Sequence, residues 1–174
     1  MPSELNNAFD VSIFFDDMAL KEGTYLPPQK LQRLLFLSQA YYAVAFNRKL
    51  MPAIFIADEL GPIEPNIYIA FSKGRPEIDA DLFLPFEAQN FLESIWQRFG
   101  TYSVERLGKI TNETLAYKNA RERGDRAEIP LAEMKNSFNK LGQVPSIDQL
   151  VKPKMMRTQS GRAVHVQTWA PRKV

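Results

Sequence analysis

The stretch that decides the fold is Pro27-Pro28-Gln29-Lys30-Leu31-Gln32-Arg33-Leu34-Leu35-Phe36-Leu37-Ser38-Gln39-Ala40-Tyr41-Tyr42. Its apolar side chains recur every three to four residues, which is the period of one face of an α-helix. Two prolines stand at its start, where a missing backbone N–H costs a helix nothing. The pattern predicts a long helix that ends near Asn47 and buries one apolar face. The polar side chains outside this stripe are expected to face outward: Lys30, Gln32, Arg33 and Gln39.

Similar periodicity predicts further helices over residues 7–21, 66–72, 86–99, from 103 onward and through 131–141. Thr111 is expected to cap a helix, and Arg121–Asp125 to form a loop. Ala53–Ala57 is apolar and β-prone, so it predicts a strand or an extended segment, and Val164–Trp169 alternates as a strand does. The fold class that follows is mainly α: a compact multi-helix single domain with a minor β element and roughly five to seven helices.

The charge is divided unevenly along the 174 residues. Six of the 22 basic residues and none of the 20 acidic ones follow Asp148, so the rest of the chain carries a net charge of −4. We therefore expect a helical domain over residues 1–145 and a basic tail over 146–174. Such a tail either contacts phosphate or an acidic protein, or is simply solvated.

Composition argues against several kinds of site. The chain has no cysteine and one histidine, His165, which excludes thiolate and two-histidine metal sites. The glycines are scattered rather than grouped into a phosphate loop, and the acidic residues lack calcium-loop spacing. We expect no metal, no cofactor and no enzymatic activity. The N-terminus does not resemble a signal peptide and no apolar run approaches the roughly 18 residues of a membrane span, so the expected compartment is the cytoplasm.

The sharpest punctuation in the chain is the segment Asp58-Glu59-Leu60-Gly61-Pro62. Proline keeps Gly61 out of the helical region and glycine tolerates positive φ, so Gly61, Pro62 and the nearby Pro65 are expected to be structural turn residues. Glu59 is open to two interpretations. It either contacts a partner from a stiff backbone, or caps the next helix or forms a buried hydrogen bond to it.

Three segments together resemble the SocA-like (Panacea, phage-associated GepA-like) family of bacterial antitoxins. The first is the helix from Lys30 to Tyr42. The second runs from Ala57 to Phe71 and contains a Gly-Pro, then a proline, then Tyr68. The third runs from Phe91 to Gly100, followed by Ser103, Leu107 and Thr111. The order and spacing of all three carry the resemblance, which spans residues 9–138.

The chain departs from the family pattern at one corner. The family's Thr-His is here Thr111-Asn112, and its Pro-Trp is Ala116-Tyr117. The departure puts in doubt whatever that corner does in other members.

The resemblance implies an antitoxin that binds and neutralises a cognate toxin protein. At least one branch of the family is thought to act as an adaptor that delivers its toxin to an ATP-dependent protease. The residues weighed as partner contacts are Lys30, Arg33, Glu59, Tyr68 and Trp96. Each has a plainer interpretation. Lys30 and Arg33 solvate a helix, Tyr68 packs its ring and directs its hydroxyl at Glu59 or Lys30, and Trp96 belongs to the core.

Two other classes of function stay open at this point. A nucleic-acid-binding regulator would use the basic tail, although the net charge of +2 is too small to predict nucleic-acid binding. A hydrolase would need titratable groups that converge only in the fold.

Overall fold

The computed structural model describes residues 2–78, 84–139, 155–157 and 163–165. The elements are α1 (Phe9–Lys21), α2 (Pro28–Phe46), β1 (Ile56–Asp58), β2 (Gly61–Ile63), α3 (Pro65–Phe71), α4 (Phe86–Phe99), α5 (Val104–Asn112), α6 (Leu115–Arg123), α7 (Leu131–Asn139), β3 (Met155–Arg157) and β4 (Ala163–His165). Helices dominate and the sheets are two-stranded, which confirms the predicted mainly α fold. The predicted boundary at residue 145 lies outside the described residues.

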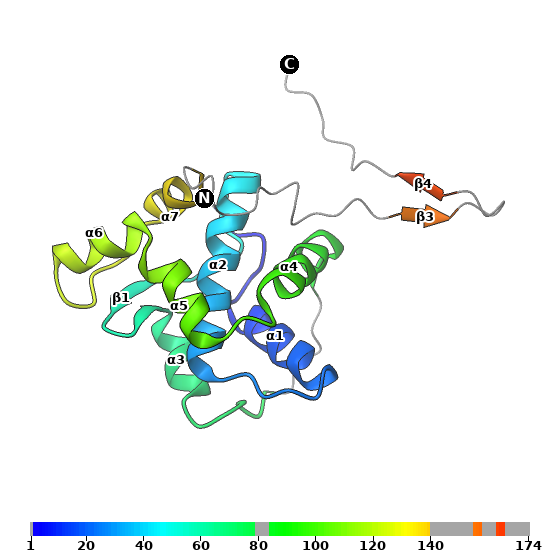
Figure 1. The fold of residues 1–174 in the computed structure, drawn as a ribbon, viewed down its shortest axis with the longest axis horizontal. Helices are drawn as coiled ribbons and strands as arrows, with labels where there is room; N and C mark the ends of the chain where they lie inside the picture. Colours follow the sequence, from blue (N-terminus) through cyan, green and yellow to red (C-terminus); the bar gives the residue numbers. More distant parts are fainter. Residues whose placement is uncertain (1, 79–83, 140–154, 158–162, 166–174) are drawn as a thin grey trace, which may run out of the picture.

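Helix α2 is the centre of the fold (Figure 1). It contacts α1 and α4 on one side and α3, α5 and β2 on the other, and it also packs along α7. The predicted apolar stripe is buried, with Leu31, Leu34 and Leu35 at most 1% exposed. Helix α2 ends as predicted at Asn47, which adopts the left-handed conformation. A helix surrounded on this many sides is buried well beyond one stripe.

This burial corrects the expectation that the polar residues of α2 face outward. Gln32, Arg33 and Gln39 are only 1%, 4% and 1% exposed. Each binds the backbone of the connection that follows α2, because a buried polar group needs a hydrogen-bonding partner. Gln39 accepts from the amides of Leu50 and Met51 and donates to the Met51 carbonyl. The polar side chains of α2 therefore hold the connection instead of meeting solvent.

The segment Ala53–Ala57 is only partly a strand. Residues 53–55 have no regular secondary structure, and the antiparallel β1–β2 pairing begins at Ile56, which pairs with Ile63. The same segment is tied to the chain before α7: the Ile129 amide donates to the Phe55 carbonyl at 2.7 Å. The small sheet is thereby fixed between α2 and the turn that leads into α7.

Two further local predictions need correction, and a third can be compared only in part because residues 166–169 lie outside the described residues. Thr114, not Thr111, caps α6, and its hydroxyl accepts from the Tyr117 amide, while Thr111 lies buried in the last turn of α5. The predicted loop at Arg121–Asp125 begins inside α6, which continues to Arg123. The strand predicted at Val164–Trp169 is described only as Ala163–His165, and its partner is β3.

Within the described ranges, no helix is both long and apolar enough to cross a lipid bilayer.

Candidate functional site

The β1–β2 turn combines an exposed tip with a backbone that neighbouring helices hold in place. Asp58 pairs with Gly61, so Glu59 and Leu60 form a two-residue tip. Both tip side chains are exposed, and Leu60 is 53% exposed. The Asp58 carboxylate turns back on the tip and accepts from the Leu60 amide at 3.4 Å.

Helix α6 holds the first half of this turn through its backbone. The Tyr117 hydroxyl donates to the Asp58 carbonyl at 2.6 Å and reaches the Glu59 carbonyl at 3.5 Å. Arg121 donates to the Ala57 carbonyl at 3.2 Å. Because three successive carbonyls accept from one helix, the backbone of the turn is fixed while its tip side chains stay exposed. Burial raises the pKa of the Tyr117 hydroxyl, so this donor keeps its proton at neutral pH.

Helix α2 holds the second half of the turn from below. Arg33 donates to the Pro62 carbonyl at 3.3 Å. Gly61 has a φ of +124°, and a Cβ atom there would lie 2.2 Å from Nη1 of Arg33 and 2.4 Å from Oδ1 of Asn112. Glycine suits this position, because other residues rarely adopt this φ and a side chain would have to displace the ends of the Arg33 and Asn112 side chains.

Arg33 is therefore a buried anchor and not a surface contact. Burial lowers the pKa of its guanidinium, and Tyr117 and Asp58 act in the opposite direction. In the part of the chain that the structure describes, no carboxylate forms a salt bridge with it, and its Nε has no hydrogen-bonding partner. Burying a cation with so few partners costs free energy. The packing of Arg33 and its hydrogen bond to the Pro62 carbonyl must offset that cost in the folded state.

The predicted capping role of Glu59 belongs instead to Glu64. The Glu64 side chain accepts from the Ile67 amide at 2.7 Å, and Pro65 follows as the first residue of α3. The Glu64 amide in turn donates to Gln32 of α2. Glu59 remains exposed and has no hydrogen bond or ion pair through its side chain among the described residues. Of the two interpretations of Glu59, capping is wrong and partner contact stays a prediction.

Lys30 and Trp96 meet on the other flank of α2. Lys30 donates to the Gly100 carbonyl, and its ammonium lies 5.9 Å from the centroid of the Trp96 ring. Burial lowers the pKa of Lys30 and Glu22 opposes that shift. Trp96 is 3% exposed and donates to Glu22 at 2.7 Å. The core interpretation of Trp96 is therefore correct, and Lys30 links α2 to the end of α4.

Tyr68 lies on the outer face of α3 and is 38% exposed. Its hydroxyl forms no hydrogen bond with Glu59 or Lys30 within the described residues, so that expectation is wrong. Its neighbour Ile69 is 71% exposed. Of the five residues predicted to contact a partner, the structure leaves Glu59 and Tyr68 exposed, half-buries Lys30, and buries Arg33 and Trp96.

Sequence reasoning missed the residues that hold the turn from α5 and α6. Asn112 and Tyr117 are the positions at which the family resemblance breaks, and both touch the turn. Contacts such as that of Tyr117 with Asp58 join residues far apart in the chain, so no local pattern in the sequence identifies them.

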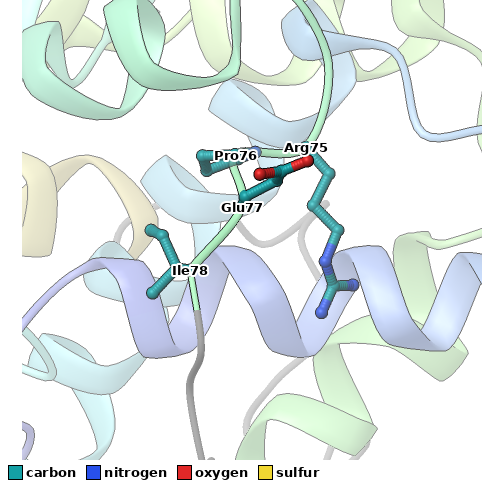
Figure 2. A pocket seen from close by; sticks show the side chains of 4 residues that line it. All are labelled: Arg75, Pro76, Glu77 and Ile78. Atoms are coloured by element: carbon teal, nitrogen blue, oxygen red, sulfur yellow. The ribbon is translucent and has the colours of Figure 1, made fainter.

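A shallow depression of about 400 Å³ lies elsewhere, after α3, lined by Arg75, Pro76, Glu77 and Ile78 (Figure 2). Its cation is already neutralised, because Arg75 bridges Asp16 and Asp17 of α1 at 2.9 and 2.5 Å. No group of three or more metal-ligating side chains occurs in the described ranges. The turn is thus the better candidate for a functional surface.

Comparisons of the chain with protein-family models, with curated proteins and with solved structures found no match.

Proposed function

We propose that this protein is an antitoxin that binds and neutralises a cognate toxin protein. The order and spacing of the three resembling segments supply the antitoxin role. The observation that carries direct binding is the β1–β2 turn, whose backbone is anchored by α2 and α6 while Glu59 and Leu60 stay exposed. A surface fixed in advance loses little conformational entropy on association, which favours affinity for a protein partner.

The experiment is expression of the toxin encoded next to this gene, alone and together with this protein. We expect growth to stop with the toxin alone and to be restored when both are produced. A purified complex of the two chains would then establish that neutralisation is by contact. Equal toxicity in the two cultures would remove the proposal.

A narrower form of the proposal is delivery of the toxin to an ATP-dependent protease. It rests on the family resemblance and on the basic segment that follows Asp148. Purified protease should degrade the toxin faster when this protein is added. Unchanged degradation would leave neutralisation by binding alone.

The second candidate is a nucleic-acid-binding regulator. The observation that favours it is that β3 and β4 pair within a segment that carries six basic and no acidic residues. Phosphate contacts release counterions, so affinity for DNA should fall steeply as salt rises. A chain that stops at Pro145 should lose that binding; binding that persists would exclude the tail as its source.

A further inference from the structure

We infer that the Glu59–Leu60 tip inserts into a protein partner that offers an apolar pocket with a lysine or arginine at its edge. The inference rests on the proposed function and specifies the chemistry of the toxin surface. It also assigns Tyr117 as the positioning residue of the tip.

Leu60 is exposed at a position where a leucine does not contribute to the packing of the fold. Two-residue hairpin tips usually carry glycine, asparagine or aspartate, which suit the backbone there. Here the positive φ falls on Gly61, and neither Glu59 nor Leu60 adopts one. The tip therefore presents an ordinary backbone with a half-exposed apolar side chain, which a partner pocket would bury.

The negative charge of Glu59 lies beside that leucine in the chain. Glu59 is exposed and has no ion pair within the described residues. The nearest arginines on this side have carboxylate neighbours: Arg121 pairs with Asp125 at 3.0 Å, and Arg126 lies 4.0 Å from Asp58. The negative charge at the tip is thus available to a cation on the partner. The same charge disfavours nucleic acid or an anionic membrane at the tip, because like charges repel.

The corner between α5 and α6 adjoins the tip and widens the surface around it. Asn112 approaches Gly61 closely, and the Tyr117 hydroxyl reaches the Asp58 carbonyl. Figure 1 shows β1, α5 and α6 on the same flank of α2. Leu115, at the start of α6, is 61% exposed. Helix α6, which holds the tip through Tyr117, thus carries an exposed leucine of its own.

Tyr117 positions the tip from beneath. Its hydroxyl holds the Asp58 carbonyl at 2.6 Å, but its ring is 8% exposed and does not form part of the presented surface. It acts on the partner only by fixing the tip. Tyr117→Phe should therefore weaken binding by a few-fold and speed amide exchange at residues 59–61, with the ring still packed.

The test measures the affinity of the full-length protein for the purified toxin encoded by the adjacent gene. We expect Leu60→Ala and Glu59→Lys each to weaken binding at least about tenfold, as for a central interface residue. The matched controls are Leu20→Ala on α1 and Glu77→Lys in the loop after α3, which are exposed and should leave affinity unchanged. Melting temperatures of all four variants should stay at the wild-type value.

The outcomes separate the two proposals. If the wild-type protein neutralises the toxin but both tip variants bind as tightly as the controls, the inference about the tip is overturned and the antitoxin function stands. If the wild-type protein neither binds nor neutralises, both fail. If Tyr117→Phe lowers only the melting temperature and leaves affinity and amide exchange at the tip unchanged, its positioning role is removed.

Discussion

Two cationic residues stand one helical turn apart on α2 and meet very different surroundings. Arg33 lies beneath the β1–β2 turn, 4% exposed, with a carbonyl as its hydrogen-bonding partner and no salt bridge within the described residues. Lys30 is half-buried, donates to the Gly100 carbonyl, and has the Trp96 ring and Glu22 nearby. Both bind a backbone carbonyl, but only Arg33 gives up nearly all contact with water. Two cations three residues apart on one helix thus differ in exposure, because α2 is covered more completely beneath the β1–β2 turn than beside the end of α4.

The largest effect is expected where Arg33 meets the turn. Gly61→Ala should lower the free energy of unfolding by about 3–4 kcal/mol, because the new Cβ adopts a strained conformation and overlaps Arg33 and Asn112. Urea denaturation measures it. The control is Gly74→Ala, which has a φ of +103° but open space around its Cβ and should cost only about 1 kcal/mol. Equal losses for the two variants would show that the close approach is unimportant.

The next largest loss of stability is expected when the buried Arg33 guanidinium is removed. Arg33→Ala loses packing and leaves the Pro62 carbonyl without its donor, which should cost about 2–3 kcal/mol. The same denaturation experiment reports it, with Arg98→Ala as a control on the exposed surface. An unchanged midpoint for Arg33→Ala would mean that the cost of burying the charge cancels all it contributes.

The same change on the other flank should be milder. Lys30→Ala removes one hydrogen bond and one contact over the Trp96 ring, both partly open to water, so we expect a loss of about 1 kcal/mol or less. A loss equal to that of Arg33→Ala would contradict the comparison between buried and half-buried cations.

The smallest expected effects are on stability at alkaline pH. The contributions of Tyr117 and Lys30 should change with pH in opposite directions. Burial raises the pKa of Tyr117, so its contribution to stability is present below the ordinary value of 10.0 and is lost as the pH rises above it. Burial lowers the pKa of Lys30, so its folded form binds fewer protons, and stability rises as the pH climbs from that lowered pKa toward 10.5. Thermal melting between pH 8 and 11 of wild type, Tyr117→Phe and Lys30→Met measures both. Relative to wild type, Tyr117→Phe should gain stability above pH 10, and Lys30→Met should lose stability as the pH rises toward 10.5. Slopes of the same sign would contradict the assigned environments.

Several features of the fold could be predicted from the sequence because they depend on short-range physics. The apolar repeat in Leu31, Leu34 and Leu35 gave the buried helix, and the prolines at its start gave its beginning. The Gly-Pro pair indicated a sharp change of direction, because glycine tolerates positive φ and proline fixes its own φ, but the structure places both residues in β2, directly after the Glu59–Leu60 tip.

The candidate site was predicted less well. Periodicity identifies one apolar face, but α2 is covered on several sides, so Gln32, Arg33 and Gln39 are buried although they fall outside the stripe. The capping residue is a different case, because Glu64 directly precedes Pro65, and proline's preference for the first helical position was a local signal that favoured Glu64 over Glu59.

By itself, then, the sequence determined the helical class, the central helix and a change of chain direction near Gly61; the predicted turn residues Pro62 and Pro65 lie instead in β2 and at the start of α3. The features that it determined follow from side-chain period and backbone restriction within a few residues. The tertiary structure alone decided that Tyr117, Arg121 and Arg33 hold the β1–β2 turn and that Glu59 and Leu60 remain exposed at its tip. The reason is physical: a hydrogen bond such as that between the Tyr117 hydroxyl and the Asp58 carbonyl joins residues 59 positions apart, and no local pattern encodes such a distance.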